Sequence, residues 1–144
     1  MDLQNKVVVV TGGAQGLGLA MAEALAAKGC NVALVDLNRE RLDAAAAHCE
    51  ALGVKAKGYE ANVAKEEEVE NLFDKVVADF GTLNGVINNA GILRDGLLIK
   101  MKDGELVKKM SLAEWQAVID VNLTGVFLCG RACAERMIKL GTEG

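Results

Sequence analysis

The stretch that decides the fold is Val7-Val8-Val9-Val10-Thr11-Gly12-Gly13-Ala14-Gln15-Gly16-Leu17-Gly18. Its run of valines ahead of a glycine-rich segment is typical of a strand that is buried on both faces. The residues from 17 to 28 are rich in Ala, Leu and Met and stop at Gly29, a residue type that often ends a helix. The sequence therefore predicts a buried strand, a glycine-rich loop and a helix in direct succession.

Strand and helix signals alternate along the rest of the chain. Further strands are predicted over 31–37, 54–61 and 85–89, and further helices over 39–52, 65–80 and 112–140. Asn38 precedes the second helix as an N-terminal cap, and Ser111 with Glu114 matches a capping box ahead of the last one. Parallel strands need crossover helices, and right-handed crossovers favour the doubly wound order. We therefore predict one α/β domain over 1–144, a Rossmann-type doubly wound parallel sheet with strand order 3-2-1-4.

Composition narrows the classes of function. Of the 144 residues, 51% are hydrophobic and 25% charged, which is ordinary for a soluble globular domain. Aromatic residues make up only 3% and the net charge is −4, which argues against a nucleic-acid partner. No apolar run is expected to reach the length of a membrane span, and the first residues lack the apolar segment of a signal peptide. We expect a cytoplasmic protein that contacts neither nucleic acid nor membrane.

The thiols and the imidazole of the chain do not suggest a metal site. Cys30, Cys49, Cys129 and Cys133 include no Cys-x-x-Cys pair, and His48 is the only histidine. Free cysteines behave as small hydrophobic residues, so we expect buried thiols, with His48 on a helix surface. We predict no bound metal.

The glycine-rich loop has the context of a phosphate-binding turn. Glycines allow a tight turn and let phosphates approach the N–H groups at the start of the following helix. The loop departs from the common G-x-G-x-x-G spacing. Its position between a predicted strand and a predicted helix is therefore stronger evidence for phosphate binding than its glycine pattern. Asp36 closes the second predicted strand, 18 residues after Gly18, near the spacing of a ribose-binding carboxylate. A simple turn residue at Asp36 is the alternative.

Three short motifs, in this order, resemble those of the short-chain dehydrogenase/reductase family. The segment Thr11-Gly12-x-x-x-Gly16-x-Gly18 resembles the cofactor loop of the family, and Asn88-Asn89-Ala90-Gly91 resembles its Asn-Asn-Ala-Gly motif. Asn122, within residues 121–127, stands where the family keeps its active-site asparagine. The matches extend over essentially the whole chain. Residues 91–98 further resemble the 3-oxoacyl-thioester reductases of the family.

The resemblance implies roles for particular residues. The cofactor-binding residues would be Gly12, Gln15, Gly16, Leu17, Gly18, Asp36, Asn62, Val63, Asn89, Ala90 and Gly91. The motif glycines would cradle a pyrophosphate, and Asp36 would hold the adenosine ribose. Asn62 replaces the usual Asp of the family, although an amide can still accept from and donate to the adenine edge. Asn122, the catalytic candidate, would interrupt its helix and hold a water of the proton relay.

The implied reaction passes a hydride between a nicotinamide and a carbonyl or alcohol carbon of a small molecule, with a 3-oxoacyl thioester as one substrate class. The family uses a serine and a tyrosine with a lysine four residues later. Here Tyr59 is followed at that spacing by Val63, and Ser111 is already explained as a helix cap. We interpret residues 1–144 as an NAD(P)-binding domain that is truncated before the catalytic residues. We expect it to be inactive alone and marginally soluble, because its fourth strand would form an open sheet edge.

Two other functions stay open. A nucleotide-binding module without chemistry would have the same motifs. A methyltransferase domain also carries a glycine loop and an acidic end of its second strand, although the Asn-Asn-Ala-Gly motif and the Asn122 segment speak against it.

The expected cofactor is NAD rather than NADP. A carboxylate at Asp36 accepts hydrogen bonds from both ribose hydroxyls and repels a 2′-phosphate. The glycine loop contains no Lys or Arg, and Arg39 is the only cation that the sequence places near Asp36.

Two segments lie outside these motifs. Asp103-Gly104 is a two-residue turn signal and predicts a β-hairpin with strands over 98–102 and 105–109, inserted near the mouth of the active site, with a mobile loop as the alternative. The predicted helix 112–140 carries apolar residues all around its circumference. We expect it to pack against the sheet on one side and a second subunit on the other, in a homodimer or homotetramer.

Overall fold

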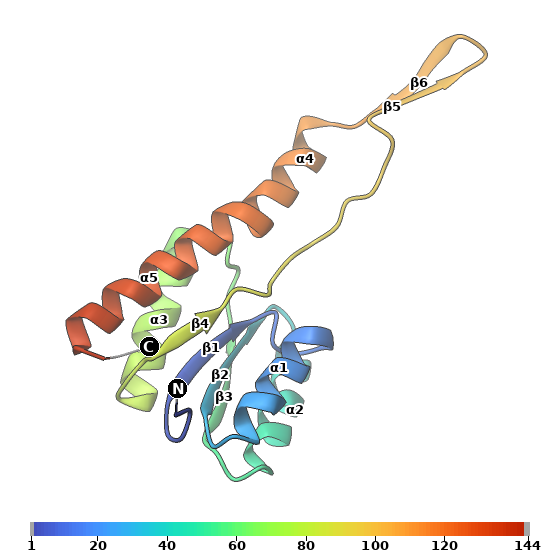
Figure 1. The fold of residues 1–144 in the computed structure, drawn as a ribbon. Coiled ribbons are helices and arrows are strands. Elements are labelled where there is room, and N and C mark those ends of the chain that lie inside the picture. Colours follow the sequence, from blue (N-terminus) through green and yellow to red (C-terminus); the bar gives the residue numbers. More distant parts are fainter. Residues whose placement is uncertain (1, 143–144) are drawn as a thin grey trace.

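Four of the strands form one parallel sheet in the order β3-β2-β1-β4, as the sequence predicts (Figure 1). The structure is a computed structural model that describes residues 2–142. The elements in chain order are β1 (Val7–Thr11), α1 (Gly16–Ala26), β2 (Asn31–Asp36), α2 (Arg39–Glu50), β3 (Ala56–Glu60), α3 (Glu66–Phe80), β4 (Gly85–Ile87), β5 (Ile99–Lys102), β6 (Glu105–Lys109), α4 (Leu112–Ile119), the π-helical turn η1 (Asp120–Thr124) and α5 (Gly125–Leu140).

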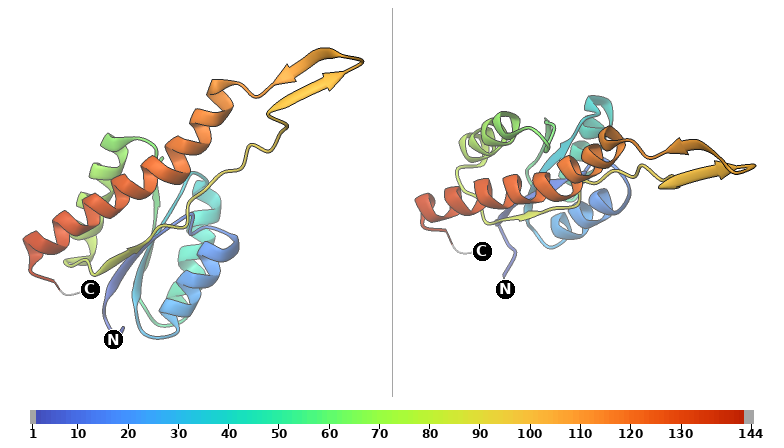
Figure 2. Two further views of the ribbon diagram at one scale, coloured as in Figure 1. Left: turned by 45° about the horizontal axis from the view of Figure 1, so that its top comes forward. Right: turned by 90° about the horizontal axis from the view of Figure 1, so that it is seen from above.

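Helices cover both faces of the sheet, so the fold is doubly wound (Figures 1 and 2). Successive residues of β1 point to opposite faces. Val9 packs with Phe73 of α3 and Cys129 of α5, whereas Val10 packs in a second core with Leu42 of α2 and the alanines of α1. Within residues 2–142, β4 pairs with no strand other than β1, so it forms one edge of the sheet.

Most predicted elements are present, and their ends differ by a few residues. The third strand covers Ala56–Glu60 rather than 54–61, and the fourth stops at Ile87 instead of reaching 89. Helices α1 and α2 end before their glycines because the chain closes each helix with a short turn first. All four cysteines are buried free thiols, as expected. His48 lies on the surface of α2 and contacts Glu23 of α1.

Residues 99–109 form the predicted hairpin. Strands β5 and β6 pair antiparallel, and the turn residues Asp103 and Gly104 both have positive φ, at 51° and 79°. Positive φ at both central residues is the signature of the type I′ turn, whose twist matches that of the strands. Every residue of the two strands is exposed, and the hairpin extends away from the sheet (Figure 1).

The predicted helix 112–140 is continuous but contains the π-helical turn η1 between α4 and α5. The side chains of Ser111 and Glu114 form the expected capping box at its start. This helix is long and apolar enough to cross a membrane, with a mean hydropathy of 1.4 over an 18-residue window, so the expectation that no apolar run has that length was wrong. The buried residues of α5 pack in one core with residues of α3; they are Leu128, Cys129, Ala132 and Cys133. Core helices of soluble proteins pass the same test.

Glu114 gives this helix start a dependence on pH. Its carboxylate accepts hydrogen bonds from the Ser111 backbone and from Lys108, which lowers its pKa from the ordinary 4.5 to about 2. The stability that it contributes is complete above pH 4.5 and is lost as the pH falls toward 2. An NMR titration of the Glu114 carboxyl should therefore have its midpoint near 2. A midpoint near 4.5 would contradict the capping box, and Glu114→Gln provides a start of α4 that does not titrate.

Candidate functional site

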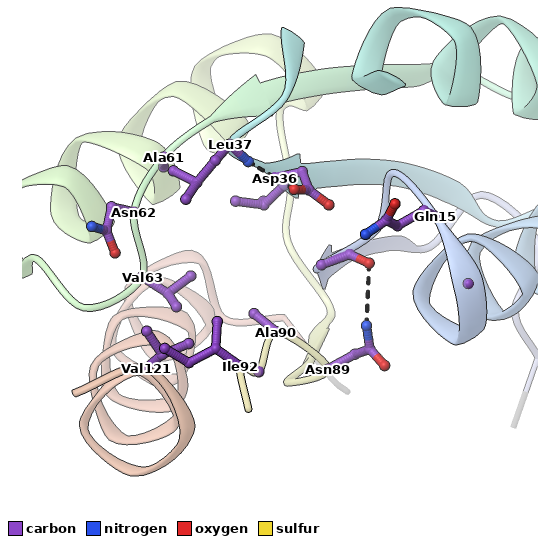
Figure 3. Close-up of a pocket in the computed structure, with 14 residues that line it drawn as sticks. Gln15, Asp36, Leu37, Ala61, Asn62, Val63, Asn89, Ala90, Ile92 and Val121 are labelled. Carbon is purple, nitrogen blue, oxygen red and sulfur yellow. Dashed lines mark hydrogen bonds between the residues drawn. The ribbon is translucent and has the colours of Figure 1, made fainter. Parts of the chain in front are cut away.

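The carboxyl ends of β1, β2 and β3 and the segment after β4 surround a cavity of about 300 Å³ (Figure 3). Predicted residues that line it are Gly12, Gln15, Gly16, Asp36, Asn62, Val63, Asn89, Ala90 and Gly91. The other lining residues are Val35, Leu37, Ala61, Ile92 and Val121, which the sequence analysis did not name as site residues. Each of these five is the sequence neighbour of a predicted site residue. In an extended strand end or a loop, residues adjacent in sequence can line the same cavity. Adjacency to a predicted site residue was therefore the sequence signal that could have identified them.

Thr11 joins the glycine loop to the segment after β4, a role that the sequence analysis also missed. Its side chain is the one buried polar or charged side chain among residues 2–142. The Thr11 hydroxyl donates to the Ile87 carbonyl at 3.3 Å and accepts from the backbone N–H groups of Asn89 and Ala90, both at 3.0 Å. In addition, the Asn89 side-chain amide donates to the carbonyls of Thr11 and Gly12, at 3.1 and 3.2 Å.

The glycines form a cradle that side chains would fill. A Cβ at Gly12, where φ is +64°, would lie 2.8 Å from Nδ2 of Asn89 and 3.1 Å from the Cα of Ala90. Gly18 is buried below the loop, and a Cβ there would lie 2.0 Å from the Gly12 carbonyl oxygen. Gly18 and Leu17 therefore do not line the cavity: Gly18 supports the loop, and Leu17 is 77% exposed at the start of α1. The open backbone at Gly12 and Gly16 fits a dinucleotide phosphate.

Asp36 is fixed at the cavity wall, next to the glycine loop. Its Oδ1 accepts from the backbone N–H of Leu37 at 2.8 Å, and its Oδ2 accepts from the N–H of Ala14 at 3.2 Å. The first contact orients the carboxylate at the end of β2, and the second ties it to the glycine loop. In Figure 3 Asp36 and Gln15 lie on the same side of the opening.

The cation nearest to this wall is not the one that the sequence suggested. Arg39 was the expected candidate, but its Nη1 donates to the Gly58 carbonyl at 3.2 Å, and its guanidinium lies 3.6 Å from Glu60 and 3.7 Å from Asp43. Arg41 instead donates from Nη1 to Oε1 of Gln15, at the cavity wall. The first turn of α2 directs these two side chains to opposite sides, and residue spacing alone does not distinguish them.

Asn62 is only partly available for an adenine. Its Oδ1 already accepts from the backbone N–H of Ala64 at 3.0 Å, and its own N–H donates to Glu68 at 2.7 Å. We expected the Asn62 amide to act toward adenine as both acceptor and donor, but its oxygen already accepts the hydrogen bond from Ala64. The neighbouring Val63 is buried against Gly125, where a Cβ would approach Val63 Cγ2 to 2.9 Å. This close approach explains a glycine in the interior of the last helix.

Asn122 lies in η1, so the helix is interrupted at the residue where we expected it. Its side chain clamps the backbone after β4: Oδ1 accepts from the Ile92 N–H at 2.8 Å, and Nδ2 donates to the Ile92 carbonyl at 3.0 Å. Asn122 itself does not line the cavity, although its neighbours Ile92 and Val121 do. Isolated π turns occur frequently at functional sites.

Comparison with known proteins identifies the family. A sequence model of the short chain dehydrogenases matches residues 6–144. This chain belongs to the short chain dehydrogenase family. The match removes the methyltransferase alternative.

Several members of the family are similar to this chain over nearly its whole sequence. It is 42% identical over 138 residues to a 3-oxoacyl-[acyl-carrier-protein] reductase of Synechocystis sp., covering 95% of this chain and 52% of the relative. It is 39% identical over 143 residues to a 2,5-dichloro-2,5-cyclohexadiene-1,4-diol dehydrogenase of Sphingobium indicum, covering 99% of this chain and 53% of the relative. The chain spans about half the length of the curated relatives it matches.

A solved structure has the same fold. The crystal structure of an NAD+-bound xylitol dehydrogenase superposes with a TM-score of 0.84 at 34% identity, covering 99% of this chain and 52% of that one. The superposition agrees with the doubly wound topology described above.

The tyrosine and the serine of this chain lie away from the cavity. Tyr59 faces α3 and donates from its hydroxyl to Asp79 at 2.7 Å. Burial, together with this hydrogen bond, raises the Tyr59 pKa far above its usual value, the opposite of what an acid–base tyrosine needs near neutral pH. Ser111 caps α4. Among residues 2–142 no group of His, Cys, Asp and Glu side chains could hold a metal ion.

Replacing Asn122 tests the clamp. Asn122→Ala removes both hydrogen bonds to Ile92 and should lower the free energy of unfolding by about 1–3 kcal/mol, since each hydrogen bond contributes about 1 kcal/mol. Hydrogen exchange of the Ile92 amide should accelerate. Asn122→Asp retains the acceptor for the Ile92 N–H and should preserve part of its protection. Unchanged exchange in Asn122→Ala would contradict the clamp.

Proposed function

We propose that these residues form the NAD(H)-binding part of an oxidoreductase that transfers a hydride between the cofactor and a carbonyl or alcohol carbon. The observation that carries the proposal is the carboxylate of Asp36, which two backbone N–H groups fix at the cavity wall beside the glycine loop. A carboxylate in that place accepts hydrogen bonds from ribose hydroxyls and disfavours a phosphate.

Each part of the cavity has a role in the proposal. Gly12 and Gly16 receive the pyrophosphate, Asp36 holds the adenosine ribose, and Val63 flanks the adenine. Asn89, Ala90 and Gly91 guide the cofactor toward the substrate. The cofactor supplies the hydride when bound. Asn122 positions the segment after β4 and holds a water of the proton relay through η1.

The names of the relatives support the substrate class. A 3-oxoacyl-[acyl-carrier-protein] reductase and a cyclic diol dehydrogenase both act on carbons that interconvert between alcohol and carbonyl. A 3-oxoacyl thioester is the substrate class that we assign. The NAD+ named in the xylitol dehydrogenase structure supports NAD as the cofactor.

The acid–base residues of the reaction are proposed to come from a longer protein that carries this sequence. Tyr59 and Ser111 do not supply them, because both side chains have other hydrogen-bond partners away from the cavity. We place this protein in the cytoplasm. We also propose a homodimer or homotetramer formed through 112–140, whose outer face exposes Trp115, Leu123 and Phe127.

Calorimetric titration with NADH and NADPH tests the cofactor. We expect NADH to bind more tightly, because bringing a phosphate within 4 Å of a carboxylate costs up to roughly 4 kcal/mol per unit of charge before screening. Tighter NADPH binding would overturn the assignment. Residues 1–144 alone should bind NADH without reducing a 3-oxoacyl thioester. A longer protein that adds the serine and the Tyr-x-x-x-Lys motif should reduce it. Binding without turnover in that protein would favour a nucleotide-binding module.

A further inference from the structure

A cation lies beside the cavity wall that holds Asp36, where it contacts a lining residue. Arg41 lies in the first turn of α2, whose start is fixed by the Asn38 side chain accepting from the Arg41 N–H at 2.9 Å. The guanidinium of Arg41 donates to the side-chain oxygen of Gln15, and Gln15 lines the cavity together with Asp36. Gln15 therefore links Arg41 to the ribose end of the proposed cofactor site.

The charge of Arg41 is not neutralised by a carboxylate. Arg39, two residues earlier, lies within 4 Å of both Glu60 and Asp43. Arg41 forms no ion pair with the carboxylates in the described part of the chain, and its side-chain partner Gln15 is a neutral amide. Its guanidinium is exposed and keeps donors that are not used by Gln15.

We propose that Arg41 is a second specificity-determining residue of the cofactor site, a latent phosphate anchor whose effect is opposed by Asp36. The inference rests on the proposed function and deepens it. A guanidinium binds phosphate oxygens through paired, charge-assisted hydrogen bonds. A 2′-phosphate on the ribose held by Asp36 would meet the Arg41 guanidinium in exchange for Gln15. The Asp36 carboxylate repels the same phosphate and keeps the preference on NADH.

In this arrangement the preference for NADH over NADPH depends on the negative charge of Asp36. Removing the negative charge of Asp36 leaves Arg41, held against Gln15, as the charged group beside the ribose end of the proposed site. NADPH affinity should then rise without the introduction of any new cation. Arg39 should have no part in the change, because its guanidinium is committed to acidic partners and to the Gly58 carbonyl.

Dissociation constants of NADH and NADPH, measured by calorimetry for four proteins, test the proposal. The proteins are the wild type, Asp36→Asn, Asp36→Asn with Arg41→Met, and Asp36→Asn with Arg39→Met as the matched control. Asparagine is isosteric with Asp36 and retains an oxygen for the Leu37 N–H. In Asp36→Asn we expect NADPH to bind at least as tightly as NADH. Adding Arg41→Met should weaken NADPH binding by about tenfold to a hundredfold, the value of a charge-assisted hydrogen bond, and leave NADH within threefold.

The control and the salt dependence complete the test. Adding Arg39→Met should leave both dissociation constants within about threefold, because exposed ion pairs contribute little. NADPH binding to Asp36→Asn should weaken with added salt more steeply than binding to the variant that also lacks Arg41. Equal NADPH affinity with and without Arg41 would overturn the role of Arg41 while leaving NADH binding intact. A wild type that binds neither dinucleotide would instead overturn the proposed function, and the inference with it.

Discussion

Replacing Thr11 with valine is expected to lower the free energy of unfolding by about 3–4 kcal/mol and to weaken dinucleotide binding at least tenfold. Valine has nearly the same shape but lacks the hydroxyl, so the N–H groups of Asn89 and Ala90 and the carbonyl of Ile87 lose their contacts with it. A buried polar group without a partner costs about 1–3 kcal/mol. The backbone at Asn89 and Ala90, which lines the cavity, would move as it seeks other partners.

Urea denaturation followed by circular dichroism measures the loss, and Thr11→Ser is the control. Serine retains the hydroxyl and lacks only a methyl group, so its cost should stay near 1 kcal/mol. Equal stability of the valine and serine variants would show that the hydroxyl contributes nothing.

Replacing Gly18 with alanine is expected to cost about 3 kcal/mol and to abolish measurable NADH binding. The added Cβ would lie 2.0 Å from the Gly12 carbonyl oxygen and 2.6 Å from Nδ2 of Asn89. Because the first of these atoms is backbone, the loop itself must move, and overpacking of this kind typically costs about 1–3 kcal/mol. A displaced Gly12 would disturb the cradle on which the phosphate site depends.

Gly130→Ala is the matched control for this glycine. Gly130 lies within α5, and a Cβ there meets nothing within 4 Å. Alanine is the better helix former, so this variant should gain about 0.5–1 kcal/mol. An unfolding midpoint of Gly18→Ala equal to that of the wild type would contradict the close contact.

Much of the architecture could be predicted because it depends on local patterns. The valines of β1, the glycine at the turn and the acidic end of β2 each act within a few residues, and the strand order follows from the handedness of crossovers. The hairpin was predictable as well, because Asp103-Gly104 is the residue pair that a type I′ turn requires. The interruption at Asn122 was expected from the family resemblance, and the poor helix propensity of asparagine and glycine agreed with it.

Other features depend on contacts between distant segments. The sequence does not say that the Thr11 hydroxyl meets residues 76 to 79 positions later. It does not say that Arg41, and not Arg39, reaches the glycine loop, because that depends on how α2 leaves β2. The position of Gly18 beneath the loop, outside the cavity wall, likewise follows from the packing of α1 on Gly12 and Asn89.

The π-helical turn also fixes where the hairpin points. In η1 the Gly125 N–H bonds to the Asp120 carbonyl, five residues back, whereas an α-helix would bond four residues back. The turn therefore contains one more residue than the helix needs, and each residue of an α-helix rotates the chain by about 100°. If residues 120–124 instead formed a regular α-helix without the loss of a residue, α4 would turn by that angle about its own axis relative to α5. The capping box at Ser111 and the hairpin attached to it would swing to another side of the domain. The wide turn thus sets the rotation of everything that precedes it on the helix, and it is the same turn from which Asn122 holds Ile92, in the segment after β4.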